Sequence, residues 1–215
     1  MDTIKTTAVL FDFDGVIMDT EAQYSFFWHK AGVDYLGMDD LENRVKGQTL
    51  TYIYDTFFGG KAKEQEEITA ALIRFEQEMD YDYIPGVLDF IADLRRNHVQ
   101  MAVVTSSNDQ KMAAVYRARP EVRTMFDRIL TAEMFTRSKP APDCFLLGME
   151  VFGTTPDTTY VFEDSFNGLK AGMASEATVI GLATTNSREA IAPLCHCVLD
   201  DFRDFTCDKM LQVHK

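Results

Sequence analysis

Six short apolar segments recur along this 215-residue chain, and their spacing limits the folds open to it. Turn-forming residues bound each segment, and helical patterns such as Val87–Arg96 and Pro142–Val151 lie between most of them. Strands that are apolar throughout and alternate with helices are typical of a parallel sheet covered on both faces. The pattern therefore predicts a doubly wound α/β fold with strands at Ala8–Phe11, Gln100–Val104, Ile129–Leu130, Thr159–Phe162, Thr178–Leu182 and Cys197–Leu199.

One interval, residues 20–83, breaks this alternation because it contains helical patterns and no convincing strand. The clearest helical spacing runs over Ala62–Met79. We predict a catalytic core made of residues 1–19 and 84–215, with a small helical domain inserted at residues 20–83. We expect the insert's own hydrophobic core to contain the apolar side chains at helical spacing and three aromatic residues near its start, namely Ile68, Leu72, Phe75, Met79, Tyr24, Phe27 and Trp28.

Composition narrows the classes of partner. A net charge of −13 argues against nucleic acids and anionic membranes. The sequence contains no run of 18 apolar residues, and its N-terminus lacks the basic-then-apolar order of a signal peptide. Four cysteines, most of them near the C-terminus, do not suggest a disulfide framework. We therefore expect a cytoplasmic protein with reduced thiols.

Two other kinds of site are disfavoured. The Cys195-His196-Cys197 cluster resembles part of a zinc site, but a second ligand pair at zinc-site spacing is missing. Hydrolysis by a Ser-His-Asp triad is also disfavoured, because no G-x-S-x-G elbow is present and no histidine lies in a motif. We expect His196 and His214 to be solvated.

Polar side chains lie directly after three of the predicted strands and within one loop. Asp12 and Asp14 come directly after the first strand, and residues 105–108 follow "MAVV". Lys139 lies in the loop "SKPAPD", and "TTYVF" is followed by Glu163 and Asp164. Ligands of open parallel sheets bind at the carboxyl ends of strands, so we expect these groups to converge.

Such a set of groups suits phosphoryl transfer. Clustered carboxylates favour Mg²⁺, which would also offset the repulsion between them. Asp12 is placed to attack a phosphoryl group, and Asp14, two residues on, to exchange a proton with the leaving oxygen. Lys139 and the Thr105 hydroxyl would stabilise the phosphoryl oxygens, and Gly15 would allow a sharp turn.

The segments "LFDFDGVIMDTE", "VVTSSND", "SKPAPDCFLLG" and "VFEDSFNGLKAG" resemble the four motifs of the haloacid dehalogenase superfamily, in its β-phosphoglucomutase-like phosphatase branch. The resemblance implies a Rossmann-like core and a mobile helical cap. It further implies an aspartyl-phosphate nucleophile, a general acid/base, a Mg²⁺ site that includes the Asp14 backbone carbonyl and Glu163 acting through water, and a phosphate site. Matched by motif, the catalytic residues are Asp12, Asp14 and Lys139, the metal residues Asp12, Asp14, Glu163 and Asp164, and the phosphate-binding residues Thr105, Ser106, Ser107, Asn108 and Lys139.

The resemblance leaves two reactions open. The mutase of this branch uses a cap arginine to grip the second phosphate of a bisphosphate. Here the matching loop reads "RVKGQTLTY", with Leu50 or a neighbour at that place and Arg44 nearby. A histidine that follows the first motif in the mutase is replaced by Tyr24, whereas Val16 suits the mutase. We therefore expect hydrolysis, with the mutase as the alternative.

The expected substrate is a small phosphorylated metabolite, such as a sugar or polyol phosphate, with pyrophosphate also open. Lys46 and Gln48 in the cap loop are candidates for contacting the leaving group. A signalling receiver domain is a weaker alternative, because it is shorter, lacks an insert and phosphorylates an aspartate that follows a later strand. A non-catalytic Mg²⁺ or phosphate binder would leave Asp14 and Lys139 without a purpose. We expect a monomer.

Overall fold

The computed structural model describes residues 6–215. Its centre is a parallel sheet with the strand order β3-β2-β1-β4-β5-β6, the order of doubly wound nucleotide-binding folds. The six predicted strands are confirmed, and the third and fourth extend by one residue. The strands are β1 (Ala8–Phe11), β2 (Gln100–Val104), β3 (Arg128–Leu130), β4 (Thr159–Glu163), β5 (Thr178–Leu182) and β6 (Cys197–Leu199).

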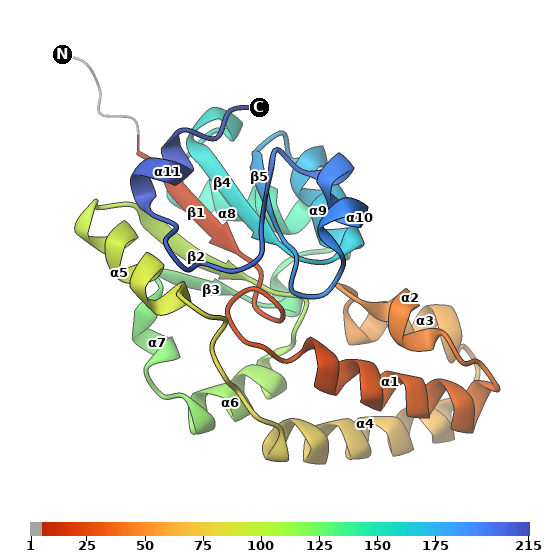
Figure 1. Cartoon of the computed structure of the whole chain (residues 1–215). Helices are drawn as coiled ribbons and strands as arrows, with labels where there is room; N and C mark the ends of the chain where they lie inside the picture. The colour runs from red at the N-terminus through yellow and green to blue at the C-terminus, as the bar shows by residue number, and fades with distance from the viewer. Residues whose placement is uncertain (1–5) are drawn as a thin grey trace.

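Helices cover both faces of this sheet (Figure 1). Because side chains alternate along a strand, Val9 and Phe11 point to one face and Leu10 to the other. The Phe11 face packs against α5 (Val87–Arg96), α6 (Asp109–Ala118), α7 (Val122–Met125) and α11 (Cys207–Leu211). The Leu10 face packs against α8 (Asp143–Phe152), α9 (Phe166–Ala174) and α10 (Arg188–Ile191). The predicted α/β class is confirmed.

Four helices separate β1 from α5 and form the helical insert. They are α1 (Glu21–Leu36), α2 (Leu41–Val45), α3 (Leu50–Phe57) and α4 (Ala62–Glu78). The insert lies beyond the carboxyl end of β1, and it has a hydrophobic cluster of its own around Trp28 and Ile68 (Figure 1). The residue ranges of the two proposed domains stay a prediction.

One expected member of the insert's core lies in the main core instead, and another contacts both cores. Met79 follows α4 and is buried in the main core cluster with Phe13 and Met18, not in the insert. Tyr24 contacts both clusters and lines a cavity described below. The helical spacing was predicted correctly, but it could not show that these two side chains reach the core.

His196 is not solvated as expected. Its Nδ1 accepts a hydrogen bond of 2.9 Å from the backbone N–H of Val179, and the backbone N–H of His196 donates to the Val179 carbonyl at 2.8 Å. Cys195 donates to the Ile191 carbonyl. The Cys-His-Cys cluster is thus part of the packing beside β5, whereas His214 is exposed as expected. No helix within residues 6–215 is both long and apolar enough to cross a bilayer.

Candidate active site

The carboxyl ends of β1, β2 and β4 bring the predicted polar residues together. Phe11 of β1 pairs with Phe162 of β4 and with Val103 of β2, and the Asp12 N–H donates to the Phe162 carbonyl at 3.0 Å. This register places the residues after the three strands side by side. Residues that are distant along the sequence thus form one cluster because the three strands are parallel and end at the same edge of the sheet.

Lys139 lies at the centre of this cluster and is completely buried. Its Nζ is 2.6 Å from Asp12 Oδ1 and 2.5 Å from Glu163 Oε1. Burial by itself lowers the pKa of Lys139, but the two carboxylates outweigh that effect and raise the pKa above its usual value. The side chain therefore stays a cation at neutral pH.

Glu163 is held by four donors. Its Oε1 accepts from Lys139, and its Oε2 accepts from the backbone N–H groups of Asp164 and Ser165 and from the Ser165 hydroxyl at 3.0 to 3.1 Å. Ser165 also caps α9 by accepting from the Gly168 N–H. With both oxygens engaged, Glu163 is placed to orient Lys139, and its predicted indirect role toward a metal stays a prediction.

Asp12, Glu163 and Asp164 form the one group of three or more candidate metal ligands in residues 6–215, with ligand atoms within 4.8 Å of one another. Asp164 Oδ2 is buried and has no hydrogen-bond partner. Burial raises the pKa of Asp12 to about 7 and that of Asp164 well above its usual value. An all-oxygen set with an unpartnered carboxylate oxygen fits a hard divalent cation.

Gly15 makes the tight turn that follows Asp14. Its φ is +74°, and a Cβ there would lie 2.2 Å from Asp164 Oδ2 and 2.9 Å from Thr185 Oγ1. Any larger side chain would thus enter the space of a candidate metal ligand. The turn expected at this glycine is confirmed.

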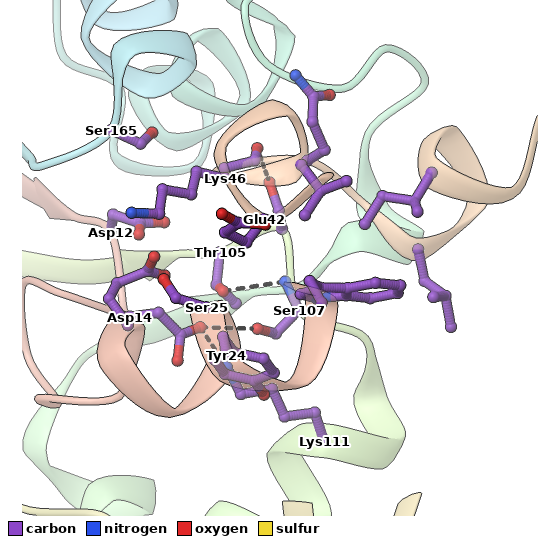
Figure 2. Close-up of a pocket in the computed structure, with 18 of the residues that line it drawn as sticks. Asp12, Asp14, Tyr24, Ser25, Glu42, Lys46, Thr105, Ser107, Lys111 and Ser165 are labelled. Atoms are coloured by element: carbon purple, nitrogen blue, oxygen red, sulfur yellow. Dashed lines mark hydrogen bonds and ion pairs between the residues drawn. The ribbon is translucent and has the colours of Figure 1, made fainter. Parts of the chain in front are cut away.

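Asp14 faces the cavity and is held by three side chains. Thr20 Oγ1 donates to its Oδ1 at 2.5 Å, Ser107 Oγ donates to its Oδ2 at 3.1 Å, and Lys111 forms an ion pair with the same Oδ2. Figure 2 shows the Ser107 contact and the position of Lys111 below it. Thr20 and Lys111 were not predicted from the sequence, since no strand-end signal marks them.

The loop after β2 turns its side chains inward. Thr105 is buried and its Oγ1 accepts from the Ser107 N–H at 3.0 Å, while Asn108 caps α6 by accepting from the Lys111 N–H. Ser106 donates to the Gly47 carbonyl of the insert at 2.9 Å. The structure brings all four predicted residues to the cavity wall, and their contact with a phosphate stays a prediction.

A cavity of about 100 Å³ lies between the strand ends and the insert. Lys46 and Gln48 line it, as the sequence suggested, together with Tyr24 and Trp28 from α1. Figure 2 shows Lys46 and Tyr24 in this wall. Three further carboxylates from the insert also face it, namely Glu21, Glu42 and Glu76. Burial, followed by repulsion from Asp14, raises the pKa of Glu21 to about 7. No sequence signal distinguishes these three acids from acids on the surface.

The loop between α2 and α3 is fastened to the core. The Lys46 carbonyl accepts from Asn167 Nδ2 at 3.0 Å, Gln48 Oε1 accepts from Ser138 Oγ at 3.0 Å, and the Thr49 N–H donates to that same hydroxyl. The carbonyl end of the Gln48 amide is therefore directed to the core.

The family model described as haloacid dehalogenase-like hydrolase matches residues 9–182. The chain belongs to this family. The match includes both acids of the first strand end, Lys139 and the Glu163-Asp164 pair.

Three similar proteins refine this placement. This hydrolase is 31% identical over 204 residues to the protein SUPPRESSOR OF QUENCHING 1, chloroplastic, of Arabidopsis thaliana, covering 87% of its own length but only 19% of that longer protein. It is 27% identical over 180 residues to the phosphorylated carbohydrates phosphatase of Thermotoga maritima, covering 78% of this chain and 81% of that protein. A solved β-phosphoglucomutase from Clostridium difficile matches with a TM-score of 0.79 at 20% identity, covering 95% of each chain. The predicted branch of the family is therefore confirmed.

Arg44, the arginine nearest to the expected position of the mutase clamp, points away from the cavity of this haloacid dehalogenase-like hydrolase. Its guanidinium pairs with Asp40, and its side chain is 53% exposed. Among the described residues, no arginine lines the cavity. Tyr24 does line it.

Proposed function

We propose that this protein is a Mg²⁺-dependent phosphatase that hydrolyses a small phosphate monoester through a phosphorylated Asp12. The observation that carries the proposal is the position of Lys139, buried between Asp12 and Glu163, the two carboxylates that cluster with Asp164 and its unpartnered oxygen. The buried ammonium and a carboxylate oxygen that is free to bind a metal ion lie in the same cluster as the proposed nucleophile. Together they suit the charge that develops on a transferred phosphoryl group.

Each side chain of the site has its own role in the proposed reaction. An Asp12 carboxylate oxygen attacks phosphorus, the bond to the ester oxygen breaks, and that oxygen takes a proton from the carboxyl group of Asp14. Water then attacks the phosphorus of the aspartyl phosphate while Asp14 takes up a proton from that water, and the bond between phosphorus and the Asp12 oxygen breaks, which releases inorganic phosphate and restores the Asp12 carboxylate. Lys139 and the Thr105 hydroxyl would bind phosphoryl oxygens. Asp12, Asp164 and the Asp14 carbonyl would hold Mg²⁺, which neutralises phosphoryl oxygen charge when bound.

Hydrolysis is favoured over transfer to a second sugar phosphate by the charges of the cavity. A mutase must retain a bisphosphate, whose second phosphate needs a cation. Arg44 is paired outside the cavity and Lys111 is paired with Asp14, so Lys46 is the one described lysine or arginine of the wall left for a second phosphate, and three acids from the insert line the same wall. A second phosphate would therefore be held poorly, and water would accept the phosphoryl group.

The proposal is tested by release of phosphate from 4-nitrophenyl phosphate in the presence of Mg²⁺. Asp12→Asn should reduce kcat to the background rate, whereas Asp39→Asn, an exposed acid of the insert, should keep the wild-type rate. Turnover retained in Asp12→Asn would rule out the nucleophile.

A second assay separates the alternatives. Incubation with β-glucose 1-phosphate and a bisphosphate primer should yield inorganic phosphate, and accumulation of glucose 6-phosphate would show the mutase instead. A panel of sugar phosphates, polyol phosphates and pyrophosphate then ranks substrates by kcat/KM.

A further inference from the structure

Lys111 is a buried cation that the proposed reaction does not use. It projects from the first turn of α6, and its side chain is only 4% exposed. Its ammonium group forms an ion pair with Asp14 and lies 4.5 Å from the centre of the Tyr24 ring and 5.6 Å from that of Phe13. A buried ammonium is costly unless it is paired, so its partners indicate what it is for.

The partners of Lys111 come from both parts of the molecule. Asp14 and Phe13 follow β1 of the core, whereas Tyr24 belongs to α1 of the insert. The Tyr24 hydroxyl donates to Glu76 Oε1 of α4 at 3.0 Å. A continuous set of contacts therefore runs from Asp14 through Lys111 and Tyr24 to Glu76, and Figure 2 shows Tyr24 beside Lys111 in the cavity wall.

The insert controls how much water reaches this ammonium. With α1 in place, the Tyr24 ring covers Lys111, and an ion pair shielded from water is stronger than one in solvent. Thr20 and Ser107 donate to Asp14 from neutral hydroxyl groups, whereas Lys111 brings a full positive charge to the carboxylate, so the contact from Lys111 is the strongest of the three. Removal of Tyr24 would hydrate the ammonium and weaken its hold on Asp14.

We propose that Lys111 is a positioning residue that fixes the Asp14 carboxyl toward the cavity while Tyr24 covers it. The insert then acts on proton transfer through Lys111 and not only by closing over the substrate. This inference rests on the proposed function, because it assigns Lys111 a task within that reaction.

The test uses two substrates that differ in their need for a proton. The leaving group of glycerol 2-phosphate needs one, whereas the phenolate of 4-nitrophenyl phosphate leaves without it. Lys111→Met should lower kcat for glycerol 2-phosphate about 10-fold or more beyond its effect on 4-nitrophenyl phosphate. Lys111→Arg should restore part of this difference. Equal losses on both substrates would mean a merely structural role and would overturn the proposal.

A double-mutant cycle adds a second readout. If Lys111 acts through Asp14, Lys111→Met should cause little further loss of glycerol 2-phosphate turnover in an Asp14→Asn background. Multiplied losses would contradict the inference. Lys170→Met, an exposed lysine of α9, is the control and should leave both activities unchanged.

Two further measurements keep the test decisive. Tyr24→Leu keeps Lys111 but removes its cover, and it should shift the ratio of the two activities in the same direction by a smaller factor; an unchanged ratio would count against the proposal. A cycle of Asp14→Asn and Lys111→Met on urea midpoints needs no activity, and fully additive shifts would show that the two side chains do not act together. Failure of the proposed function is separate, because it would appear as absent wild-type turnover or an active Asp12→Asn variant.

Discussion

Lys139 and Asp12 meet across 127 residues of chain, with Nζ and Oδ1 2.6 Å apart and the lysine completely out of contact with solvent. Glu163 shares the same ammonium. The lysine thus neutralises two buried carboxylates and remains a cation next to the proposed nucleophile. We therefore expect both stability and activity to depend on this one ammonium.

Lys139→Met should lower the free energy of unfolding by about 3–5 kcal/mol, because it leaves buried carboxylates without their cation. Urea denaturation at pH 7.5 measures this change. Lys170→Met removes an exposed lysine and should change stability by less than about 0.5 kcal/mol. Equal stability of the two variants would show that the buried ammonium is not needed to hold the site together.

Gly15→Ala should be more damaging than Gly37→Ala, although both glycines have positive φ. A Cβ at Gly37, the residue after α1, meets nothing within 4 Å, so its substitution should cost only the backbone strain of about 1–2 kcal/mol. At Gly15 the clash with Asp164 adds about 1–3 kcal/mol and displaces a metal ligand. Urea midpoints and Mg²⁺-dependent turnover compare the two, and similar losses would contradict the geometry.

Mg²⁺ should raise the thermal midpoint of the protein, because it would bind the folded acid cluster and not the unfolded chain. At a concentration of 100 times the dissociation constant, the gain is about 2.7 kcal/mol, or several degrees for a chain of this size. Asp164→Asn should abolish the shift, whereas Asp39→Asn should retain it. A shift that survives in Asp164→Asn would place the cation elsewhere.

Glu21→Gln should make the metal-free protein less sensitive to pH. Burial raises the pKa of the folded Glu21 carboxyl from 4.5 to about 7, so the folded state binds more protons than the unfolded state between these values. Stability contributed by this group therefore falls as pH rises from about 4.5 to about 7. The variant escapes this loss, and its advantage over wild type should grow across that window by about 3 kcal/mol.

Urea midpoints at pH 5 and pH 7.5 in the presence of EDTA measure this difference. Its size should not change between pH 7.5 and pH 8.5, because the carboxyl is ionised in both states there. A difference that is constant from pH 5 to pH 7.5 would show that Glu21 is solvated.

Continuous apolar runs and the turn residues that bound them are local signals. They predicted the six strands of residues 6–215, with each strand end correct to within one residue. The helix Ala62–Glu78 was likewise apparent from its spacing. Periodicity does not reveal the partner of a side chain, however. We therefore assigned Met79 to the core of the insert, although it lies in the main core. We also expected His196 to be solvated, although it accepts a hydrogen bond from Val179 of β5.

The convergence of Asp12, Lys139 and the Glu163-Asp164 pair could be predicted because each lies at a strand end or in a motif, and parallel strands end at one edge of the sheet. Lys111, Tyr24 and Glu76 carry no such signal, since each looks like an ordinary helix residue. Sequence by itself determined the sheet, the helical insert and the groups that meet at the strand ends. Only the tertiary structure decided how the insert contacts Asp14, because an ion pair between buried side chains depends on the packing of helices that are distant along the chain.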